Sequence, residues 1–244
     1  MFKNIKKLSK ELFPIILHQV SLEQNNNQIV SNANLKIQSP GITVIMGPNG
    51  SGKSVLVRLL HGLLEPTQGF ITYGAHSLNK SIRRRQSMVF QNPTLLRRTV
   101  LANMEFVASM RANIDQARCK KTLDLLGLRE LESQPAKLLS AGEKQRLALA
   151  RSLILEPCIL FLDEPTANLD PSSVYVIEKI LKDVCKLGVK IIFITHDIGQ
   201  AKRIADDIVF VNKGQILEHT DTDSFFQKPQ TPETAAYLDG KIIL

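Results

Sequence analysis

The amino-acid sequence predicts an α/β protein with a mostly parallel sheet covered by helices. Short apolar runs alternate with helical patterns along the 244 residues, and this alternation is typical of such a sheet. Between Pro93 and Pro157 no strand pattern occurs, so an all-helical insertion is expected there. We therefore predict one domain over residues 1–244, with a helical subdomain at about 93–157 and a short C-terminal tail at 221–244.

The expected strands are short and apolar, and turn signals or helical patterns separate them. Core strands are expected at residues 15–20, 42–46, 70–73, 87–90, 159–162 and 190–195. A final hairpin is expected at 208–211 and 215–218, with Asn212-Lys213-Gly214 as its turn. Helices are expected near 55–60, 100–110, 115–126 and 143–155. In the tail, Phe225 and Phe226 are expected to pack against the body of the domain.

The charge balance is basic, with a formal net charge of +8, and nucleic acid, anionic lipid or solubility could each account for it. Aromatic residues make up only 5% and no RNA- or DNA-reading motif accompanies the charge, so nucleic acid is not an expected partner. The run Arg83-Arg84-Arg85 is either a phosphate-binding patch or a solvated face. Three scattered cysteines fit a reducing compartment.

No apolar run approaches the roughly 20 residues that span a bilayer, so no transmembrane helix is expected. At the N-terminus, Phe2, Ile5, Leu8 and Leu12 fall near helical spacing among several lysines. This pattern predicts either a helix packed on the surface of the domain or a contact with a membrane surface.

The most informative stretch is GPNGSGKS at residues 47–54, which fits the phosphate-binding loop pattern G-x-x-x-x-G-K-S/T. It lies between an expected strand and an expected helix, as that pattern requires. Its glycines let backbone N–H groups turn around a β-phosphate, Lys53 supplies a positive charge, and the Ser54 hydroxyl can bind Mg²⁺. The loop therefore predicts a nucleoside triphosphate site.

A second motif, ILFLDE at residues 159–164, ends an apolar strand in two carboxylates. Such a strand carries Asp163 to the sheet edge beside the phosphate loop, where it can hold Mg²⁺ through water. Glu164 is then placed to polarise an attacking water as general base. A surface pair of acids without function is the alternative, and the phosphate loop argues against it.

A third motif, LSAGEKQ at residues 139–145, opens a helical pattern. Ser140 and Glu143 form an S-x-x-E capping box, which leaves the positive end of that helix exposed. Taken alone, the motif would be an ordinary helix start.

In order and spacing, GPNGSGKS, Gln91 in VFQNP, LSAGE, ILFLDEPTANLD and ITHD resemble the motifs of ABC transporter ATP-binding subunits. The resemblance covers residues 15–241. It implies a P-loop NTPase (RecA-like) core sheet with an inserted helical subdomain of the ABC ATPase type. It also implies ATP hydrolysis, with ATP and Mg²⁺ bound.

The resemblance gives each motif a role. The Walker A loop corresponds to Gly47, Pro48, Asn49, Gly50, Ser51, Gly52, Lys53 and Ser54, and the signature motif to Ser140, Ala141 and Gly142. Gln91 resembles the glutamine that connects the Mg²⁺ site to the membrane subunits. The Mg²⁺ site is implied to consist of Ser54, Asp163 and Gln91 itself. Glu164 resembles the catalytic glutamate, Asp170 ends the D-loop at 167–170, and His196 resembles the switch histidine that contacts the γ-phosphate.

The resemblance further implies two copies packed head to tail, with each ATP held between the Walker A loop of one and the signature helix of the other. Transmembrane permease subunits and, indirectly, a solute-binding protein would be its partners at the cytoplasmic face of the inner (plasma) membrane, where the chain is peripheral. The family docks a permease coupling helix near residues 92–100. There Leu95 and Leu96 either contact the permease or pack in the core, and Arg97 and Arg98 form a polar rim.

Two positions depart from the family pattern. The usual signature is LSGGQ, whereas this chain has Ala141 and Glu143, from which we expect slower or retuned activity. The family's adenine-stacking aromatic is expected near Gln24, and no aromatic residue is present there. Because stacking on a base contributes about 1–3 kcal/mol, we expect weak nucleotide affinity or base selectivity.

Among importers, the chain most resembles the ATPases of tungstate and related oxyanion uptake, through the short segment 69–83, THDIGQAKRIAD and the C-terminal tail. Phosphate and amino-acid importers share much of this pattern, and an exporter would have the same ATP site. A weakly active, nucleotide-gated interaction module is a further alternative, suggested by the altered signature. ATPases that act on DNA or ribosomes usually carry two fused cassettes or a long coiled coil, and neither is present here.

Overall fold

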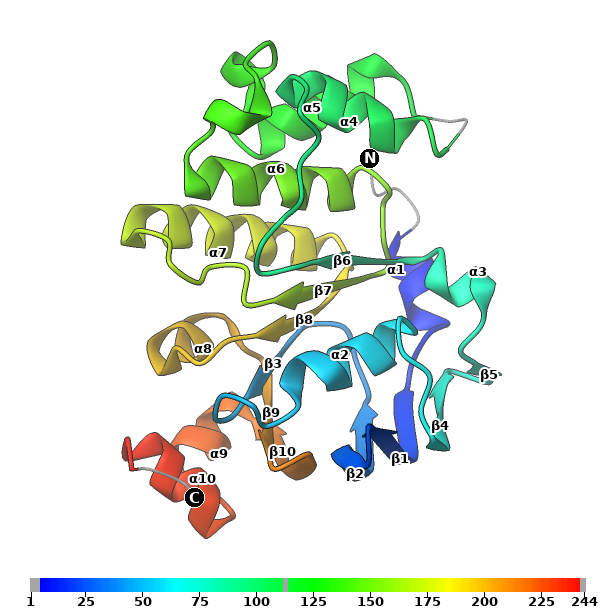
Figure 1. The fold of residues 1–244 in the computed structure, drawn as a ribbon, viewed down its shortest axis with the longest axis vertical. Helices are drawn as coiled ribbons and strands as arrows, with labels where there is room; N and C mark the ends of the chain where they lie inside the picture. The colour runs from blue at the N-terminus through cyan, green and yellow to red at the C-terminus, as the bar shows by residue number, and fades with distance from the viewer. Residues whose placement is uncertain (1–4, 112–113, 242–244) are drawn as a thin grey trace.

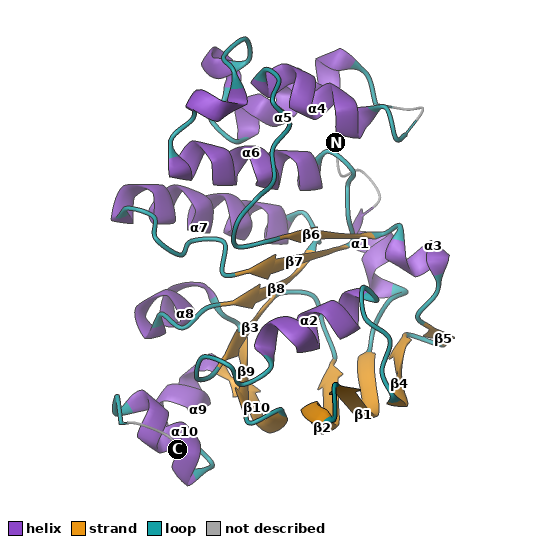
Figure 2. Cartoon of the chain, in the orientation of Figure 1, coloured by secondary structure: helices purple, strands orange, loops and turns teal. Residues whose placement is uncertain are grey.

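The computed structural model describes residues 5–111 and 114–241 (Figure 1). Two sheets form its β structure, one of six strands and one of four. Helices flank the larger sheet, and a group of helices gathers at one end of the molecule (Figure 2). Within the described residues no helix is long and apolar enough to cross a membrane.

The larger sheet is parallel except at one edge. Its spatial order is β10 (Gln215–Asp221), β9 (Asp207–Asn212), β3 (Ile42–Met46), β8 (Lys190–Ile194), β7 (Ile159–Asp163) and β6 (Gln86–Val89). Only β10 runs antiparallel to its neighbour. The β9–β10 turn has Lys213 and Gly214 at φ 47° and 76°, which is the backbone that a two-residue hairpin turn requires. The predicted hairpin is therefore confirmed.

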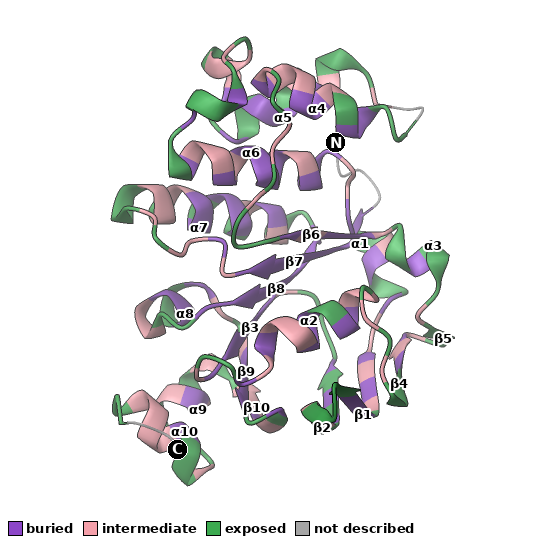
Figure 3. Ribbon diagram, viewed as in Figure 1, coloured by how far each residue is buried: buried purple, intermediate pink, exposed green. Residues whose placement is uncertain are grey.

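Both faces of this sheet are covered, so β3, β7 and β8 are buried at every position (Figure 3). Alternate residues enter two separate cores: Ile45 and Phe161 meet helix α2 (Lys53–His61) on one face. On the other face the core includes residues of α7 (Pro171–Lys186) and α8 (Ile198–Ile204). Uninterrupted apolar runs in the sequence follow from this double burial.

The tail forms two short helices, α9 (Thr222–Gln227) and α10 (Pro232–Leu238). Phe225 is fully buried and its ring centroid lies 6.2 Å from that of Phe210 in β9, while Phe226 is partly buried beside it. The expected packing of this aromatic pair against the domain is confirmed.

The second sheet corrects one sequence prediction. Residues 15–20 and 70–73 were expected in the parallel sheet, but they belong to an antiparallel sheet in the order β2 (Asn27–Ile37), β1 (Ile15–Gln24), β4 (Gln68–Tyr73) and β5 (His76–Ser77). Strand β2 was not predicted at all. Its pairing with β1 contains several register shifts, so its buried positions do not alternate regularly and its strand pattern is obscured.

The helices at residues 93–157 are α4 (Val100–Ala108), α5 (Gln116–Leu125) and α6 (Ala141–Leu153), with 3-10 turns at Arg129–Leu131 and Ala136–Leu138. No strand is present among the described residues of this segment, as predicted. Two further short helices, α1 (Ile5–Lys10) and α3 (Lys80–Arg83), precede β1 and β6. Ile5 and Leu12 are 3% exposed, so the N-terminal helix packs on the domain; Phe2 lies outside the described residues.

Candidate active site

The sequence motifs converge at one edge of the parallel sheet. The loop of residues 47–54 follows β3, Asp163 is the last residue of β7, and Gln91 and His196 each stand two residues beyond β6 and β8. These four strands are consecutive neighbours in the sheet. Because parallel strands end at a common edge, side chains that are far apart in sequence meet there.

The shape of the loop depends on Gly47. Its φ is 145°, and a Cβ on this residue would lie 1.9 Å from the carbonyl oxygen of Val211 in β9. Gly50 and Gly52 also have positive φ. No other residue type fits at the first position, since the chain leaves β3 in direct contact with its neighbouring strand.

Three observations indicate that the loop is suited to binding phosphate. Lys53 is 5% exposed, and its ammonium group donates to the carbonyl oxygens of Gly47 and Pro48, at 2.9 and 2.7 Å. Helix α2 begins at Lys53 without a side-chain cap, so its first N–H groups remain available. The Ser51 hydroxyl is buried without a hydrogen-bond partner among the described residues. Phosphate oxygens are the acceptors that such a set of donors suits.

Ser54 and Asp163 are joined directly, since the Ser54 hydroxyl donates to Asp163 Oδ1 at 2.8 Å. Burial raises the pKa of Asp163, and the Ser54 hydrogen bond partly opposes this. Burial also lowers the pKa of Lys53, against the charges of Glu164 and Asp163. The described residues contain no cluster of three or more His, Cys, Asp or Glu side chains able to hold a metal ion. A cation here would take one hydroxyl, one carboxylate and otherwise phosphate or water oxygens, as Mg²⁺ does.

Glu164 lies between the two remaining predicted groups. Its Oε2 atom accepts a hydrogen bond from Gln91 Nε2 at 3.4 Å and lies 3.5 Å from His196 Nδ1. The backbone of Glu164 has φ 45°, an uncommon value for a residue with a side chain. The turn after β7 thus aims this carboxylate toward the glutamine and the histidine. In the described part of the chain, Gln91 has its hydrogen bond to Glu164, and no hydrogen bond joins it to Ser54 or Asp163.

A cavity of about 420 Å³ lies between the phosphate loop, Gln91 and Glu164, and neither Asp163 nor His196 is among its lining residues. It is lined by Ile29, Asn49, Gly50, Ser51, Gly52, Lys53, Ser54, Val55, Gln91 and Glu164. Sequence reasoning did not find Ile29, because strand β2 was not predicted. Gln24 ends β1 and is exposed, with Asn25 and Asn26 at φ 51° and 60° in the turn beside it.

The three signature residues lie elsewhere. Ser140 caps α6, and the predicted capping box is present: Ser140 N donates to Glu143 Oε2 at 2.8 Å and Glu143 N to Ser140 Oγ at 3.3 Å. A Cβ on Gly142 would lie 2.3 Å from Ser173 Oγ, whose hydroxyl donates to Asp170 at 2.6 Å. None of these residues lines the 420 Å³ cavity.

Tyr237 in α10 is a second neighbour that sequence reasoning missed. Its ring centroid lies 5.2 Å from that of Phe210, which pairs with Met46, the residue before Gly47. Burial raises the pKa of Tyr237; a backbone hydrogen bond with Gly47 opposes the rise and the charge of Glu164 adds to it. No local sequence pattern in the tail predicts this contact between Tyr237 and the phosphate loop.

A family model described as ABC transporter matches residues 30–167, more than half of the chain. The chain belongs to the ABC transporter family. The glutamine transport ATP-binding protein GlnQ of Geobacillus stearothermophilus is 32% identical over 92% of this chain and 97% of the relative. The tungstate uptake system ATP-binding protein TupC of Peptoclostridium acidaminophilum is 36% identical, over 87% and 99%. The phosphate import ATP-binding protein PstB 1 of Vibrio cholerae is 30% identical, over 98% and 94%.

Solved structures of this family share the fold. One is cbiO1 of Clostridium perfringens, part of the ABC transporter complex cbiONQ, with a TM-score of 0.81 and 29% identity over 90% of this chain and 93% of that one. Another is a dimeric ATP-binding cassette in a post-hydrolysis state with ADP and Pi bound, with a TM-score of 0.77 and 27% identity over 85% and 98%. The chain is thus an ABC transporter ATP-binding subunit with a P-loop NTPase fold, and it hydrolyses ATP.

Proposed function

We propose that this ABC ATPase drives import of a small solute, an oxyanion such as tungstate, through separate permease subunits. The observation that carries the chemistry is the placement of Glu164, held by Gln91 and His196 at the cavity that Lys53 and Ser54 line. The relatives named for glutamine, tungstate and phosphate transport support import. Tungstate is favoured by the relative with 36% identity.

In this proposal, Lys53 and the first N–H groups of α2 bind the phosphates of ATP. Ser54 and Asp163 hold Mg²⁺, with Gln91 nearby, and the bound ion supplies positive charge to the phosphate oxygens. Glu164 accepts a proton from the attacking water, and His196 contacts the γ-phosphate. Because His196 and Gln91 both contact one oxygen of Glu164, they restrict the direction in which that carboxylate accepts the proton.

The signature residues act across a dimer. Ser140, Ala141 and Gly142 lie at the uncovered start of α6, outside the cavity of their own chain. A helix start with free N–H groups suits an anion presented by a second copy. The dimeric cassette with ADP and Pi supports pairing of two copies. In our proposal the two copies pack head to tail and enclose two ATP molecules. Asp170, bonded to Ser173 against Gly142, belongs to the same contact.

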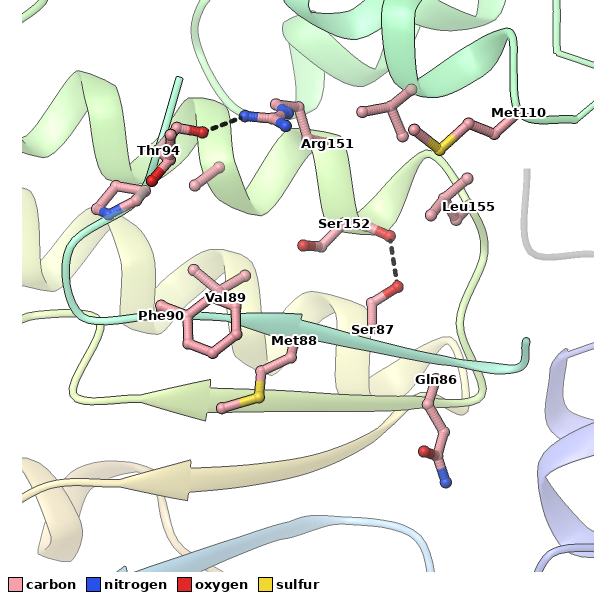
Figure 4. Close-up of a pocket in the computed structure, with 13 residues that line it drawn as sticks. Gln86, Ser87, Met88, Val89, Phe90, Thr94, Met110, Arg151, Ser152 and Leu155 are labelled. Carbon is pink, nitrogen blue, oxygen red and sulfur yellow. Dashed lines mark hydrogen bonds between the residues drawn. The ribbon is translucent and has the colours of Figure 1, made fainter. Parts of the chain in front are cut away.

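A groove beside β6 suits the permease (Figure 4). Its volume is about 450 Å³, and it runs between β6, the loop after it, α4 and α6. Phe90 and Met110 are 42% and 64% exposed there, and Arg151 fixes the loop by donating to the Thr94 carbonyl oxygen at 2.7 Å. Leu95 packs against the core of its own chain. We therefore assign the apolar contact with the permease to Phe90 and Met110 instead of Leu95. A permease bound there places the chain at the cytoplasmic face of the inner membrane as a peripheral subunit.

The domain division belongs to the same proposal: one ABC ATPase domain over residues 1–244, a helical subdomain at about 93–157 and a tail from 221. The test of the chemistry is Glu164→Gln. We expect turnover of ATP by the assembled complex to fall by about 100-fold or more, the range that a general base contributes. The exposed Glu130 supplies a matched control, since Glu130→Gln should leave turnover unchanged. Equal rates for Glu164→Gln and the parent chain would contradict the catalytic role, and low turnover in both would favour the interaction module.

The solute requires its own measurement. The solute-binding protein encoded beside this chain should be titrated with tungstate, molybdate, phosphate and sulfate. We expect tungstate to bind with the highest affinity. If none of the four anions binds, the oxyanion assignment fails, while the ATPase assignment stands.

A further inference from the structure

A second cavity, of about 540 Å³, lies away from the nucleotide. Its lining residues come from α1, the connection between α3 and β6, the connection between α4 and α5, the start of α5 and the residues before β7. Figure 1 shows where these elements lie. Four arginines line it: Arg84, Arg85, Arg111 and Arg118. We call it the basic cavity. It shares no lining residue with the 420 Å³ cavity at the phosphate loop.

The basic cavity holds more positive than negative charge. Arg85 Nη1 lies 3.3 Å from Glu11 Oε2, and Arg118 Nη2 lies 2.8 Å from Glu156 Oε1. Among the described residues, Arg84 and Arg111 are not in an ion pair with any carboxylate. Arg111 Nη2 instead donates to the backbone carbonyl oxygen of Arg84 at 2.6 Å, which brings the Arg111 guanidinium to the same rim. An anion would relieve the repulsion among these groups.

The floor of the basic cavity is apolar. Ile5, Leu8, Ile114 and Leu155 line it, and Cys158, 2% exposed, closes its base. Charges interact more strongly beside apolar surface than in open water, because water screens them less there. Guanidinium groups also bind phosphate through two parallel hydrogen bonds, which a lysine cannot form. Apolar walls with a guanidinium rim therefore suit a phosphate group attached to an apolar body.

We propose that the basic cavity binds a phosphate group, recognised by Arg84 and Arg111 at the rim and by Arg85 and Arg118 on the wall. The phosphate belongs either to an anionic phospholipid headgroup or to a soluble phosphate. The run Arg83-Arg84-Arg85, which the sequence left open between a phosphate patch and a solvated face, is then partly a binding element. This site is independent of ATP and of the transported solute.

The test must separate this site from the phosphate loop, which also binds phosphate. Full-length Lys53→Ala protein is titrated calorimetrically with inorganic phosphate, alone and with Arg84→Gln/Arg111→Gln added. We expect Lys53→Ala to retain phosphate binding and the added arginine substitutions to weaken it about tenfold or more. Lys179→Gln/Lys182→Gln on α7 removes the same amount of charge from exposed positions and should have no effect.

A second arm tests the lipid source, by sedimenting the same proteins with phosphatidylcholine vesicles with and without phosphatidylglycerol. Binding that depends on phosphatidylglycerol and on the two arginines identifies a headgroup, whereas arginine-dependent binding of phosphate alone identifies a soluble ligand. Arg84→Lys/Arg111→Lys keeps the charge and should bind with intermediate affinity. Circular dichroism and the ATP turnover of Arg84→Gln/Arg111→Gln, both expected to be unchanged, exclude misfolding. The proposal is overturned if neither probe binds, or if binding does not respond to the arginine substitutions.

Discussion

Asp163 combines two opposed requirements at the scale of a single residue. As the proposed ligand for Mg²⁺ it must be ionised, yet burial raises its pKa above the ordinary value. At pH values between the ordinary and the raised pKa of Asp163, this carboxyl binds more protons in the folded state than in the unfolded state. The free energy of unfolding therefore falls as pH rises through that window, and the loss persists at neutral pH.

We therefore predict that Asp163→Asn stabilises the nucleotide-free protein at pH 7 while abolishing Mg²⁺-dependent turnover. Thermal unfolding should show a melting temperature a few degrees above that of the parent chain. The difference should shrink as pH falls through the window between the raised and the ordinary pKa, and it should be gone below about 4, where the carboxyl is protonated in the folded and the unfolded state. A lower melting temperature for Asp163→Asn at pH 7 would show that burial does not destabilise this carboxylate.

Gln24 stands at the position where the family's adenine-stacking aromatic residue is expected. It stands at the end of β1 in a hairpin whose second strand touches the phosphate loop: a Cβ on Gly52 would lie 2.9 Å from the Ile29 carbonyl oxygen. We predict that Gln24→Tyr tightens ATP binding by about 5- to 150-fold, the equivalent of about 1–3 kcal/mol of stacking. Gln24→Leu adds apolar surface without a π-face and should tighten binding much less. An unchanged dissociation constant for Gln24→Tyr would show that this position is not the adenine platform.

The residues that sequence reasoning placed in the nucleotide cavity are those whose chemistry is local: a glycine-rich turn, or a carboxylate at the end of an apolar strand. Ile29 and Tyr237 were missed for a physical reason. Each reaches the site through tertiary packing, Ile29 from an irregular strand and Tyr237 from the tail. A single apolar or aromatic residue carries no pattern of its own.

At the scale of elements, Gln200 ties α8 to α7 and to the turn after β7. This side chain is 1% exposed. Its Oε1 accepts from Thr166 Oγ1 at 2.9 Å, and its Nε2 donates to Glu178 Oε1 at 3.1 Å. Arg203 in turn donates to both oxygens of Glu178. Thr166 follows Glu164 by two residues, and α8 starts two residues after His196, so the segments that carry these two proposed catalytic residues share one hydrogen-bond network.

We predict that Gln200→Glu lowers the ATP turnover number about tenfold with little change in ATP affinity. The new carboxylate would repel that of Glu178 and disturb the turn that carries Glu164, which should slow hydrolysis. Neither carboxylate lines the nucleotide cavity, so ATP affinity should change little. The double variant Gln200→Glu/Glu178→Gln restores one donor and one acceptor and should recover most of the turnover. Steady-state kinetics and nucleotide titration separate the two effects. Equal turnover in the single and double variants would mean that this network does not position the catalytic turn.

The two sheets show which strand properties a sequence pattern predicts and which it does not. The parallel strands were predicted because burial on both faces makes them continuously apolar. The separate antiparallel sheet was not, because β1 and β4 have the same apolar character and only pairing distinguishes the sheets. Which strands pair with each other depends on contacts between residues that are far apart in the sequence, and a local pattern does not contain this information.

At the scale of the whole molecule, the proposed head-to-tail dimer requires each copy to supply half of each ATP site. The phosphate loop and Glu164 line one cavity, while Ser140 and Ala141 are exposed at the start of α6 and Gly142 is buried beside Ser173. A site divided in this way closes only when a second copy supplies the missing half, so nucleotide and dimer formation are linked. Slowing hydrolysis should then trap the closed state.

We therefore predict that Glu164→Gln with ATP and Mg²⁺ sediments at twice the mass of the 27.2 kDa chain, whereas the nucleotide-free protein does not. Adding Ser140→Arg places a bulky side chain where the partner's phosphate would lie, and should return the protein to the monomer. Ser133→Arg adds the same side chain at an exposed position of the helical subdomain and should leave the dimer intact. Analytical ultracentrifugation distinguishes these states. A Glu164→Gln dimer that forms equally well with Ser140→Arg would show that the signature helix does not contact the nucleotide of the partner copy, and a protein that stays monomeric with ATP would remove the basis for a composite site.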